Sequence, residues 1–378
     1  MTSKAARAAA SMLLGALLAA SPLWAQEPAP SAGPVAPRAG WIGWALSART
    51  SHHNDALPLA LSGDDDARLL TPRQGRNLAY VDDELRLSRH QGGWSVALLA
   101  RSYGTLVASR QALELAAEVA AQTLPGRDRT WAVDLRLRSF AGGGIAVGRT
   151  QSLGGGWRGS AEVQALLLKR WHERRVDGAV QFGAAARQFS FALRSDERDN
   201  RLDFPYQDRT AARGAALLFA TGLTWEGERA WLDLGLRDGG WMRWRGMPGQ
   251  QQTLNTATQD VDADGFLVYR PLIEGRDTQD GRTHGWSGRA SLAGGAMLRA
   301  GQRLGLRVES LPGFGLRPAL LWQRLAPDGL AWGAEWRLHE RRLDLSATWR
   351  GLALRVGVDR LGPSARSREL ALAHHAAF

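Results

Sequence analysis

The sequence predicts an all-β protein, built as a single closed antiparallel β-barrel of about 16 strands (about 14–18) with a short helix between two early strands. Three observations lead to this fold class. Many stretches of about ten residues alternate between apolar and polar side chains, the period of a strand with one apolar face. Short turns alternate with longer polar segments along the chain. No stretch after residue 25 is apolar for long enough to form a membrane helix, so a membrane-crossing chain of this sequence has to be a closed barrel.

The first residues predict export. Two basic residues precede a short apolar run, Met12–Ala20, and the small residue Ala25 stands at the expected cleavage position, so residues 1–25 are predicted to be a signal peptide. A retained N-terminal anchor is the alternative, but the run is shorter than the about 20 residues that a spanning helix needs. Residues 26–40 are rich in Pro and Ala and predict a flexible linker. The barrel is then expected over residues 41–378.

Composition narrows the classes of function. The chain has no Cys, which excludes a disulfide framework and thiolate chemistry. Its formal net charge is +11, from 48 Lys and Arg residues against 37 Asp and Glu. The Arg residues are scattered along the chain and do not form one basic patch, so binding to nucleic acid is not expected.

The alternation of apolar and polar residues defines the strands. In the stretch 94–103 one face carries Trp94 and aliphatic residues, and the other carries Arg101. Residues 368–378 repeat this pattern at the end of the chain. Three further stretches sort in the same way: 131–139, 229–238 and 352–360. Each stretch has the length of a tilted transmembrane strand, about 9–11 residues.

The count of candidate strands is one more than the even number expected of such a barrel. Either 41–49 is a segment that plugs the lumen, or Gly142–Thr150 belongs to a turn. The second interpretation is preferred, because the apolar run there is the shortest and its flanks are rich in Gly. The longer polar segments 196–212 and 239–285 are expected to be loops. The candidate strands are 41–49, 79–89, 94–103, 131–139, 144–150, 157–170, 174–183, 187–195, 213–225, 229–238, 286–299, 303–311, 316–323, 330–338, 343–350, 352–360 and 368–378.

Tryptophan positions favour a bilayer environment. An amphipathic aromatic ring prefers the membrane interface, where the ring is buried and the indole N–H stays hydrated. Six Trp residues stand at the ends of candidate strands: Trp94, Trp131, Trp157 and Trp286 open strands, and Trp225 and Trp349 close them.

With its export signal, its ladder of alternating strands from about residue 79 onward and its aromatic last residue, the chain resembles the outer-membrane β-barrel proteins of Gram-negative bacteria, in the porin-like class. The resemblance implies a place in the outer membrane and contact with its lipids. It also implies that Phe378, at the end of an amphipathic strand, is the signal read by the barrel-assembly machinery. The oligomeric state stays open.

One segment reads as a helix. Residues 109–126 have apolar spacing of the helical type, with Ser109 as the N-cap and Leu124-Pro125-Gly126 as the stop. A helix between two strands would cap the barrel, fold into its lumen or lie on one rim.

An acidic segment in the predicted loop 239–285 suggests a calcium site. Three carboxylates at alternate positions precede Gly265, as in the first half of an EF-hand loop: Asp260, Asp262 and Asp264. The twelfth position, where a bidentate Glu belongs, is Pro271, which excludes a regular EF-hand. A weak loop-ordering Ca²⁺ site is the remaining hypothesis, with a solvated acidic turn as the alternative. No other cofactor is expected.

The pentapeptide Ser51–Asp55 contains the residue types of a hydrolase relay. Adjacent residues of an extended chain point in opposite directions, so this segment cannot assemble the relay alone. A partner His would have to come from elsewhere, for instance His172, His284 or His339. A hydrolase of envelope lipids is therefore a lesser alternative.

The predicted inner face carries Arg and carboxylate residues in near balance. Charged groups inside a barrel need water or partners, and a barrel of this size is wide enough for an aqueous channel. The sequence therefore favours a channel for small solutes with at most a mild preference for anions. A non-conducting structural or accessory barrel, braced by Arg–carboxylate ladders, is the other alternative. The residues predicted to line the pore are Arg86, Arg101, Asp134, Arg136, Arg138, Arg194, Arg289, Arg307, Glu309, Glu335, Arg337 and Arg355.

Overall fold

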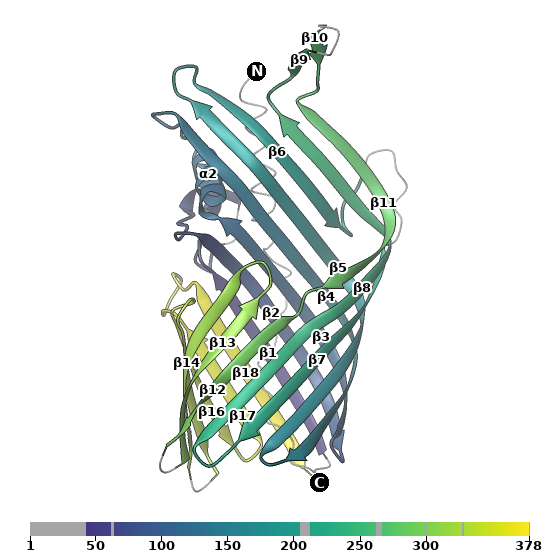
Figure 1. The fold of residues 1–378 in the computed structure, drawn as a ribbon, viewed down its shortest axis with the longest axis vertical. Coiled ribbons are helices and arrows are strands. Elements are labelled where there is room, and N and C mark those ends of the chain that lie inside the picture. The colour runs from purple at the N-terminus through teal and green to yellow at the C-terminus, as the bar shows by residue number, and fades with distance from the viewer. Residues whose placement is uncertain are drawn as a thin grey trace.

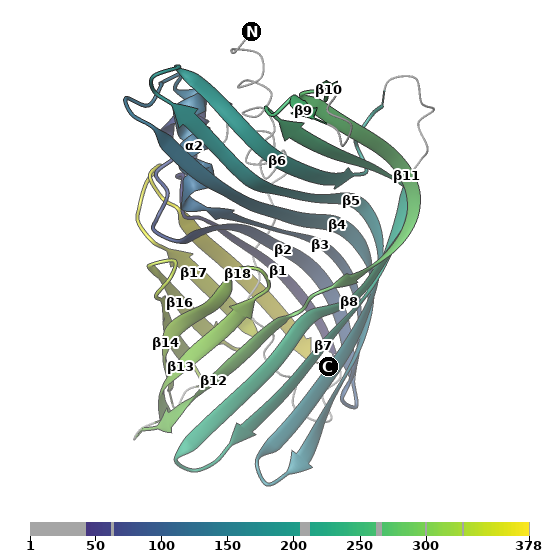
Figure 2. The ribbon, with the colours of Figure 1, turned by 45° about the horizontal axis from the view of Figure 1, so that its top comes forward.

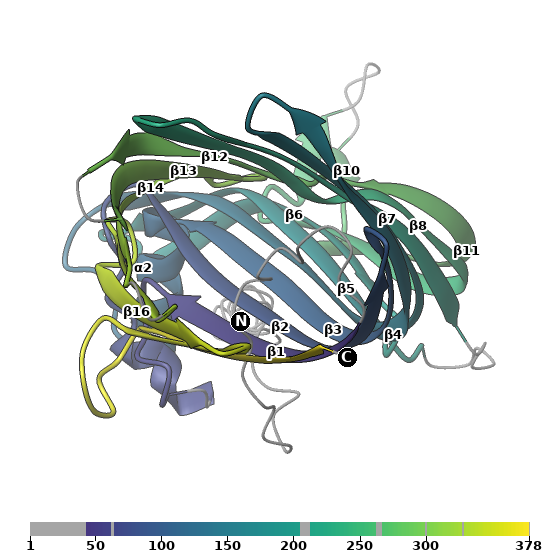
Figure 3. The ribbon, with the colours of Figure 1, turned by 90° about the horizontal axis from the view of Figure 1, so that it is seen from below.

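The computed structural model describes residues 43–61, 64–204, 212–261, 267–298, 301–326 and 329–377, and the statements below concern these residues. Their main feature is a 16-stranded antiparallel sheet in which 14 strands close into a ring (Figures 1 and 3). The ring closes through β1 (Gly43–Asn54) and β18 (Ser367–Ala377), which pair from Gly43 opposite Ala377 to His53 opposite Ser367. The predicted all-β class and closed barrel are confirmed.

Most neighbours around the ring are also neighbours in sequence, as in an up-and-down barrel. The other strands of the ring are β2 (Arg76–Gln91), β3 (Trp94–Ser109), β4 (Arg129–Gly154), β5 (Trp157–Gly183), β7 (Arg213–Glu226), β8 (Ala230–Asn255), β12 (Arg289–Met297), β13 (Gln302–Leu311), β14 (Gly315–Leu325), β15 (Ala331–Arg337), β16 (Arg342–Trp349) and β17 (Leu352–Val358). A separate hairpin is formed by β9 (Gln259–Val261) and β10 (Leu267–Tyr269).

Two further strands, β6 (Gln188–Asp199) and β11 (Ile273–Trp286), lie outside the ring. They join the upper halves of β4, β5 and β8 in what we call the tall wall, which rises above the opposite side of the barrel (Figures 1 and 2). β5 pairs with β7 along 157–168 and then with β6 along 172–183. β5 has 27 residues, whereas β15 and β17 have 7 each. The wall of the barrel is therefore strongly uneven in height.

Both expectations about the surplus strand are wrong. The segment 41–49 does not plug the lumen, because its described part belongs to β1, which pairs with β18 and β2. Gly142–Thr150 is not a turn either, because it continues β4 without interruption. The predicted strands 131–139 and 144–150 are thus one strand, and 157–170 and 174–183 are also one.

The predicted loop 239–285 is mostly strand. β8 continues to Asn255, and β11 returns alongside it from Ile273. The period-two pattern there alternates between two hydrated faces instead of a lipid face and a lumen face. Because both faces are polar along 248–253 of β8 and 274–283 of β11, hydropathy does not mark these parts as strand.

The predicted helix is present as α2 (Arg110–Ala120), and the hydroxyl of Ser109 accepts a hydrogen bond from the backbone N–H of Ala112 at 3.2 Å. It neither enters the lumen nor caps it. Its apolar residues share a buried cluster with Trp131 and Leu135 of β4, which lie on the strand face opposite to Arg136. The helix therefore packs on the outer face of the tall wall, next to the short 3₁₀ helix η1 (Asp64–Leu69).

None of the helices in the described part of the chain has the length and hydropathy needed to span a bilayer.

The tryptophans divide into two groups. Trp94 and Trp349 are 51% and 47% exposed beside the short turns, which suits the interfacial position predicted for them. Trp131 is fully buried beneath α2, and Trp286 is buried against Phe140 and Trp171 inside the ring, so the interfacial prediction is wrong for both. A Trp at a strand end lies at the membrane interface only if the strand itself ends at that interface.

Gly144 lies on the inner face of β4, where the strand approaches β5 closely. A Cβ atom there would stand 1.9 Å from the carbonyl oxygen of Ala165. We predict that Gly144→Ala lowers the free energy of unfolding of the refolded barrel by about 1–3 kcal/mol, because backbone has to move. The check is the urea midpoint at which the compact band on an unboiled SDS gel is lost. Gly183→Ala, where a Cβ meets nothing within 4 Å, is the control, and equal midpoints for the two variants contradict the close β4–β5 approach.

Candidate functional site

Strand pleating sorts the barrel residues onto two faces of different chemistry. The outer face of the ring is a belt of exposed aliphatic side chains, for example Leu98 at 61% and Leu167 at 76% exposed. The inner face carries the charged residues, and cross-strand register places Asp82 of β2, Arg101 of β3 and Glu84 on that face. An apolar exterior and a charged interior are what a barrel in lipid requires.

The central feature of the lumen is an ion bridge between opposite sides of the ring, which we call the lumen bridge. Arg289 of β12 donates from Nη1 to Oδ2 of Asp82 on β2 at 2.7 Å. The same guanidinium donates from Nη2 to Oδ2 of Asp238 at 2.5 Å. Arg101 donates to the other oxygen of Asp238 at 2.6 Å, and Arg49 of β1 pairs with Asp82. Each of the two carboxylates thus has two Arg partners.

The ring order shows that this bridge crosses the lumen. β12 is six strands from β2 in one direction around the ring and eight in the other, so the two strands lie on opposite sides. The guanidinium of Arg289 also stacks on Tyr103 of β3, 4.6 Å from the ring centroid. The barrel seen from below is flattened (Figure 3), which brings the two sides within reach of one Arg side chain.

A second set of contacts joins the same two sides nearer the tall wall. The guanidinium of Arg317 on β14 lies 4.9 Å from the ring centroid of Tyr80 on β2, and it donates to Glu340 at 2.7 Å. Leu78 of β2 belongs to one buried cluster with Leu311 of β13. The two sides of the ring therefore meet at two successive levels.

The short side of the ring carries a network of a different kind. Its Arg and carboxylate residues pair within one strand or across one or two strands of the same wall, so they brace that wall and do not cross the lumen. Arg342 pairs with Asp344 at 2.6 Å and with Glu369, while Arg355 pairs with Glu335 at 2.6 Å and with Asp344 at 2.9 Å. Ser51 donates to Glu369 at 3.1 Å and connects this network to β1.

At the rim above these contacts, the carboxylate of Asp55 organises the first long connection. Nε2 of His53 and Nε2 of His339 each lie 3.0 Å from its oxygens, and Arg73 pairs with it at 2.7 Å. The backbone N–H of Leu78 donates to it at 2.8 Å. Burial of this carboxyl raises its pKa, but the hydrogen bonds from the two His residues outweigh burial and hold the pKa well below its usual range.

Two groups of His and carboxylate residues have ligand atoms close enough together to hold a metal ion: His53, Asp55 and His339, and His172, Glu197 and Asp199. In the first group both oxygens of Asp55 already accept from protein donors, including Arg73. In the second group Arg170 occupies Asp199 with both Nη atoms. A cationic partner on the ligand carboxylate opposes metal binding at each group.

The inner face of the tall wall is a hydrated continuation of the lumen surface. Arg136 and Asp134 of β4 are 46% and 40% exposed there, and Arg175 of β5 is 58% exposed. Arg138 donates to His284 of β11 at 2.7 Å and stacks on Trp286, at 4.5 Å from the ring centroid. The wall thus presents charged groups of both signs above the constriction.

The structure places the twelve predicted pore-lining residues on inner faces, at three different levels. Arg101 and Arg289 are in the lumen bridge, and Arg86 is next to it through Glu84, which pairs with Arg86 at 3.2 Å and with Arg101 at 3.3 Å. Those on the short side take part in its wall network: Arg307, Glu309, Glu335, Arg337 and Arg355. Those on the tall wall lie above the ring: Asp134, Arg136, Arg138 and Arg194. Arg194 is on β6, outside the closed ring.

Asp238 is the member of the lumen bridge that the sequence pattern missed. In strict alternation it would share a face with Leu236 and point outward. It has a positive φ of 65° and lies in a bulge, where Arg237 and Asp238 both stand opposite Ala220, so its side chain turns into the lumen. The signal in the sequence is the Asp-Gly-Gly run that begins at Asp238, since Asp and Gly tolerate this conformation.

Two predicted features fall outside the described residues. Phe378 lies beyond Ala377, and Asp262 and Asp264 lie between β9 and β10. Asp260 is in β9, where its backbone pairs with Val268. The assembly signal and the calcium site therefore remain predictions.

The Ser51–Asp55 segment does not assemble a hydrolase relay. Ser51 donates to Glu369 and not to a His. Nε2 of His52 is shared by Thr50 and Asp83, at 3.1 and 3.0 Å, whereas a relay needs the hydroxyl and the acid on different ring nitrogens. His339 does reach this segment, as the sequence allowed, but it meets Asp55 and no nucleophile.

The rim contacts of Asp55 yield a prediction on local stability. Asp55→Asn replaces an acceptor of three hydrogen bonds that also holds an ion pair with Arg73, and it should cost about 1–3 kcal/mol, so that trypsin cleaves after exposed Arg68 at least about fivefold faster. Because the pKa of Asp55 is lowered, its stabilisation is complete above the unfolded value near 4 and is lost only as the pH falls through the lower folded value. Protection of the segment around Arg68 from backbone hydrogen exchange should therefore persist in the parent barrel down to about pH 4.

Asp177→Asn, at an exposed carboxylate on the tall wall, is the control and should leave cleavage after Arg68 unchanged. Equal cleavage rates in the parent and Asp55→Asn barrels, measured by mass spectrometry, contradict an organising role for Asp55.

Comparison with known proteins gives limited information. No family model matches the sequence, and a search of curated sequences finds no match. Among solved structures, the P. putida toluene transporter TodX is similar over 90% of this chain and 89% of its own, with 8% identity and a TM-score of 0.35. The Ralstonia pickettii toluene transporter TbuX is similar over 90% of both chains, with 7% identity and a TM-score of 0.31. Values this low carry no information on a solute of this chain. The closed ring, its apolar exterior and its charged interior are those of an outer-membrane β-barrel protein.

Proposed function

We propose that this protein is a channel for small solutes, with at most a mild preference for anions, in the outer membrane of a Gram-negative bacterium. The lumen bridge is the observation that carries the proposal. Arg289 reaches from one side of the ring to Asp82 on the other, and Arg101 reaches Asp238 in the same way, so a small group of charged side chains joins the two sides at this level. Ion pairs that cross the lumen can control the passage of solutes. Ion pairs that only brace the barrel need to join nearby strands of one wall.

The bridge can separate without leaving a buried charge unpaired. When Arg289 moves away, Asp82 keeps Arg49 and Asp238 keeps Arg101. Removing one partner of a buried pair is costly when the other has no second partner. The duplicated partners lower that cost, so a closed and an open arrangement of the same residues are both accessible.

The selectivity follows from the tall wall, which a solute meets first. The inner faces of β4, β5 and β6 carry five Arg and four carboxylates: Arg136, Arg138, Arg175, Arg194 and Arg198, with Asp134, Glu173, Asp177 and Asp196. This near balance supports weak selectivity. The short turns at the opposite end of the barrel suit the periplasmic side, which places the tall wall outside the cell.

A non-conducting accessory barrel is the second candidate. The contacts at two levels that join the two sides of the ring favour it, because side chains cross the lumen at both levels. The channel requires that the lumen bridge opens, whereas the accessory barrel requires that it stays formed.

Current through refolded protein in a planar bilayer distinguishes them. We predict brief openings for the parent barrel and, for Arg289→Ala, an open fraction at least about tenfold higher, because the lost contact is a buried ion pair. Arg355→Ala is the matched control, since it removes an inner-face Arg from the wall network and leaves the bridge intact. If no variant carries current, the channel proposal fails and the accessory barrel replaces it.

Selectivity gives a separate prediction. Replacing Arg136 and Arg138 together with Gln removes two positive charges from the mouth and should shift the reversal potential toward that of the cation. The shift should shrink at 1 M salt, where screening shortens to about 3 Å. Arg149→Gln, on the outer face of the same strand, is the control. An unchanged reversal potential in the double variant shows that the tall wall is not on the path of the ions.

A further inference from the structure

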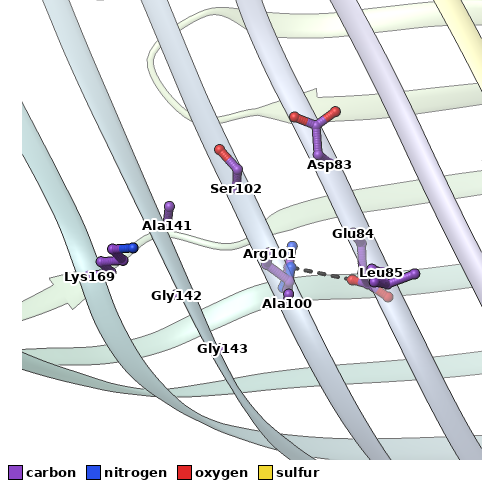
Figure 4. Close-up of a pocket in the computed structure, with 10 residues that line it drawn as sticks. All are labelled: Asp83, Glu84, Leu85, Ala100, Arg101, Ser102, Ala141, Gly142, Gly143 and Lys169. Atoms are coloured by element: carbon purple, nitrogen blue, oxygen red, sulfur yellow. Dashed lines mark ion pairs between the residues drawn. The ribbon is translucent and has the colours of Figure 1, made fainter. Parts of the chain in front are cut away.

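A shallow groove of about 390 Å³ crosses the outer face of β2 to β5, at the upper border of the aliphatic belt (Figure 4). Its floor is low because the outward-facing residues of β3 and β4 there are small, among them Ala100, Ala141 and Gly143. Leu85 borders it on β2, and Lys169 stands at the β5 end. The groove is open toward the position of lipid acyl chains.

A row of basic residues continues from Lys169 over the next two strands. Arg213 of β7 and Arg243 and Arg245 of β8 lie on the outer face, and all four side chains are exposed. We call these four residues the basic row. None of them makes a hydrogen bond or ion pair with its side chain in the described part of the chain. Nearby outer-face Arg residues differ, since Arg170 pairs with Asp199 and Arg174 with Glu197 at 3.4 Å.

The strand register places like charges of the basic row next to each other. Arg213 and Arg245 are directly opposite each other on adjacent antiparallel strands, and Arg243 follows two residues away on the same face. Like charges in directly opposed positions destabilise a sheet. Such an arrangement calls for an anion from outside the chain.

The height of the basic row fixes where that anion has to be. Leu167 of β5 and Trp241 of β8, at 76% and 57% exposed, belong to the lipid-facing belt. Arg243 follows Trp241 by two residues on the same face, toward the tall wall. Lys169 follows Leu167 at a bulge in the β4–β5 pairing and lines the groove on the outer face. The row is therefore at the level of the lipid head groups, and the groove beside it is at the level of the first acyl carbons.

We infer that the groove and the basic row together bind one molecule of lipopolysaccharide. Its lipid phosphates lie against the basic row, and one acyl chain lies in the groove. Four cations spread over three strands match a head group with more than one phosphate, whereas a phospholipid such as phosphatidylglycerol offers a single phosphate. The inference rests on the proposed placement in the outer membrane, with the tall wall outside, and does not depend on conduction.

The test measures binding of purified lipopolysaccharide to the refolded full-length barrel in detergent, by native mass spectrometry with a titration of the lipid. Replacing Arg213, Arg243 and Arg245 together with Gln should raise the Kd at least about tenfold, since each lost phosphate contact removes a charge-assisted hydrogen bond. The matched control replaces three exposed Arg residues on the inner face of the tall wall with Gln: Arg175, Arg194 and Arg276. It removes the same charge and should leave the Kd unchanged.

A second arm tests the groove. Ala100→Phe fills it from an exposed position and should weaken binding of the intact lipid but not of its deacylated, phosphorylated sugar. Unboiled gel mobility shows that each variant is folded. Equal Kd values for the parent and the Arg213, Arg243 and Arg245 variant overturn the inference, as does equal binding of dephosphorylated lipid. Binding of phosphatidylglycerol as tight as that of lipopolysaccharide overturns the choice of lipid. Current is not a readout here, so failure of the channel proposal leaves this result interpretable.

Discussion

The contact between Arg289 and Asp82 is the constraint on which the barrel interior depends. Fourteen strands can enclose a lumen wide enough for water, but the charges on their inner faces have to be hydrated or paired. In this protein the ring is flattened, and the charges of opposite sides pair with each other through Arg289. Asp238 pairs with both Arg101 and Arg289, so the lumen bridge also couples β3, β8 and β12. The shape of the lumen is thus decided by side chains, and side chains can rearrange without unfolding the ring.

The uneven height of the wall has consequences on both of its faces. On the outer face, the upper part of β4 leaves the lipid level, so its apolar residues are covered by α2, with Trp131 and Leu135 in one cluster with the helix. On the inner face, the same strand keeps Asp134 and Arg136 in water. At the border between lipid and water, the outer face of the barrel carries the basic row and, beside it, the groove. Along its length, β4 therefore passes from the lipid level, past the head-group level, to the hydrated tall wall.

Sequence alone was sufficient for the fold class, for α2 with its Ser109 cap and for the face of most inner charges, because alternation and capping are local properties. Sequence alone was insufficient where the alternation of inward and outward side chains, or their polarity, changes along a strand. Asp238 was missed because a bulge reverses the alternation at that residue. The continuation of β4 through Gly142–Thr150 was missed because Gly carries no hydropathy signal, and the pairing of Arg289 with Asp82 was missed because it depends on the flattening of the whole ring.

The most direct test of this account is the distance between the two sides of the lumen. The chain has no Cys, so the pair Glu84→Cys with Ser291→Cys, two residues from Asp82 and Arg289 on the same inner faces, leaves the lumen bridge in place and can be joined by a bifunctional thiol reagent. The account predicts rapid intramolecular cross-linking of the folded barrel, and none for Glu84→Cys with Leu292→Cys, since Leu292 is on the outer face of β12, 50% exposed. A folded barrel in which the Glu84 and Ser291 positions do not cross-link has an open, round lumen, and that result contradicts the lumen bridge.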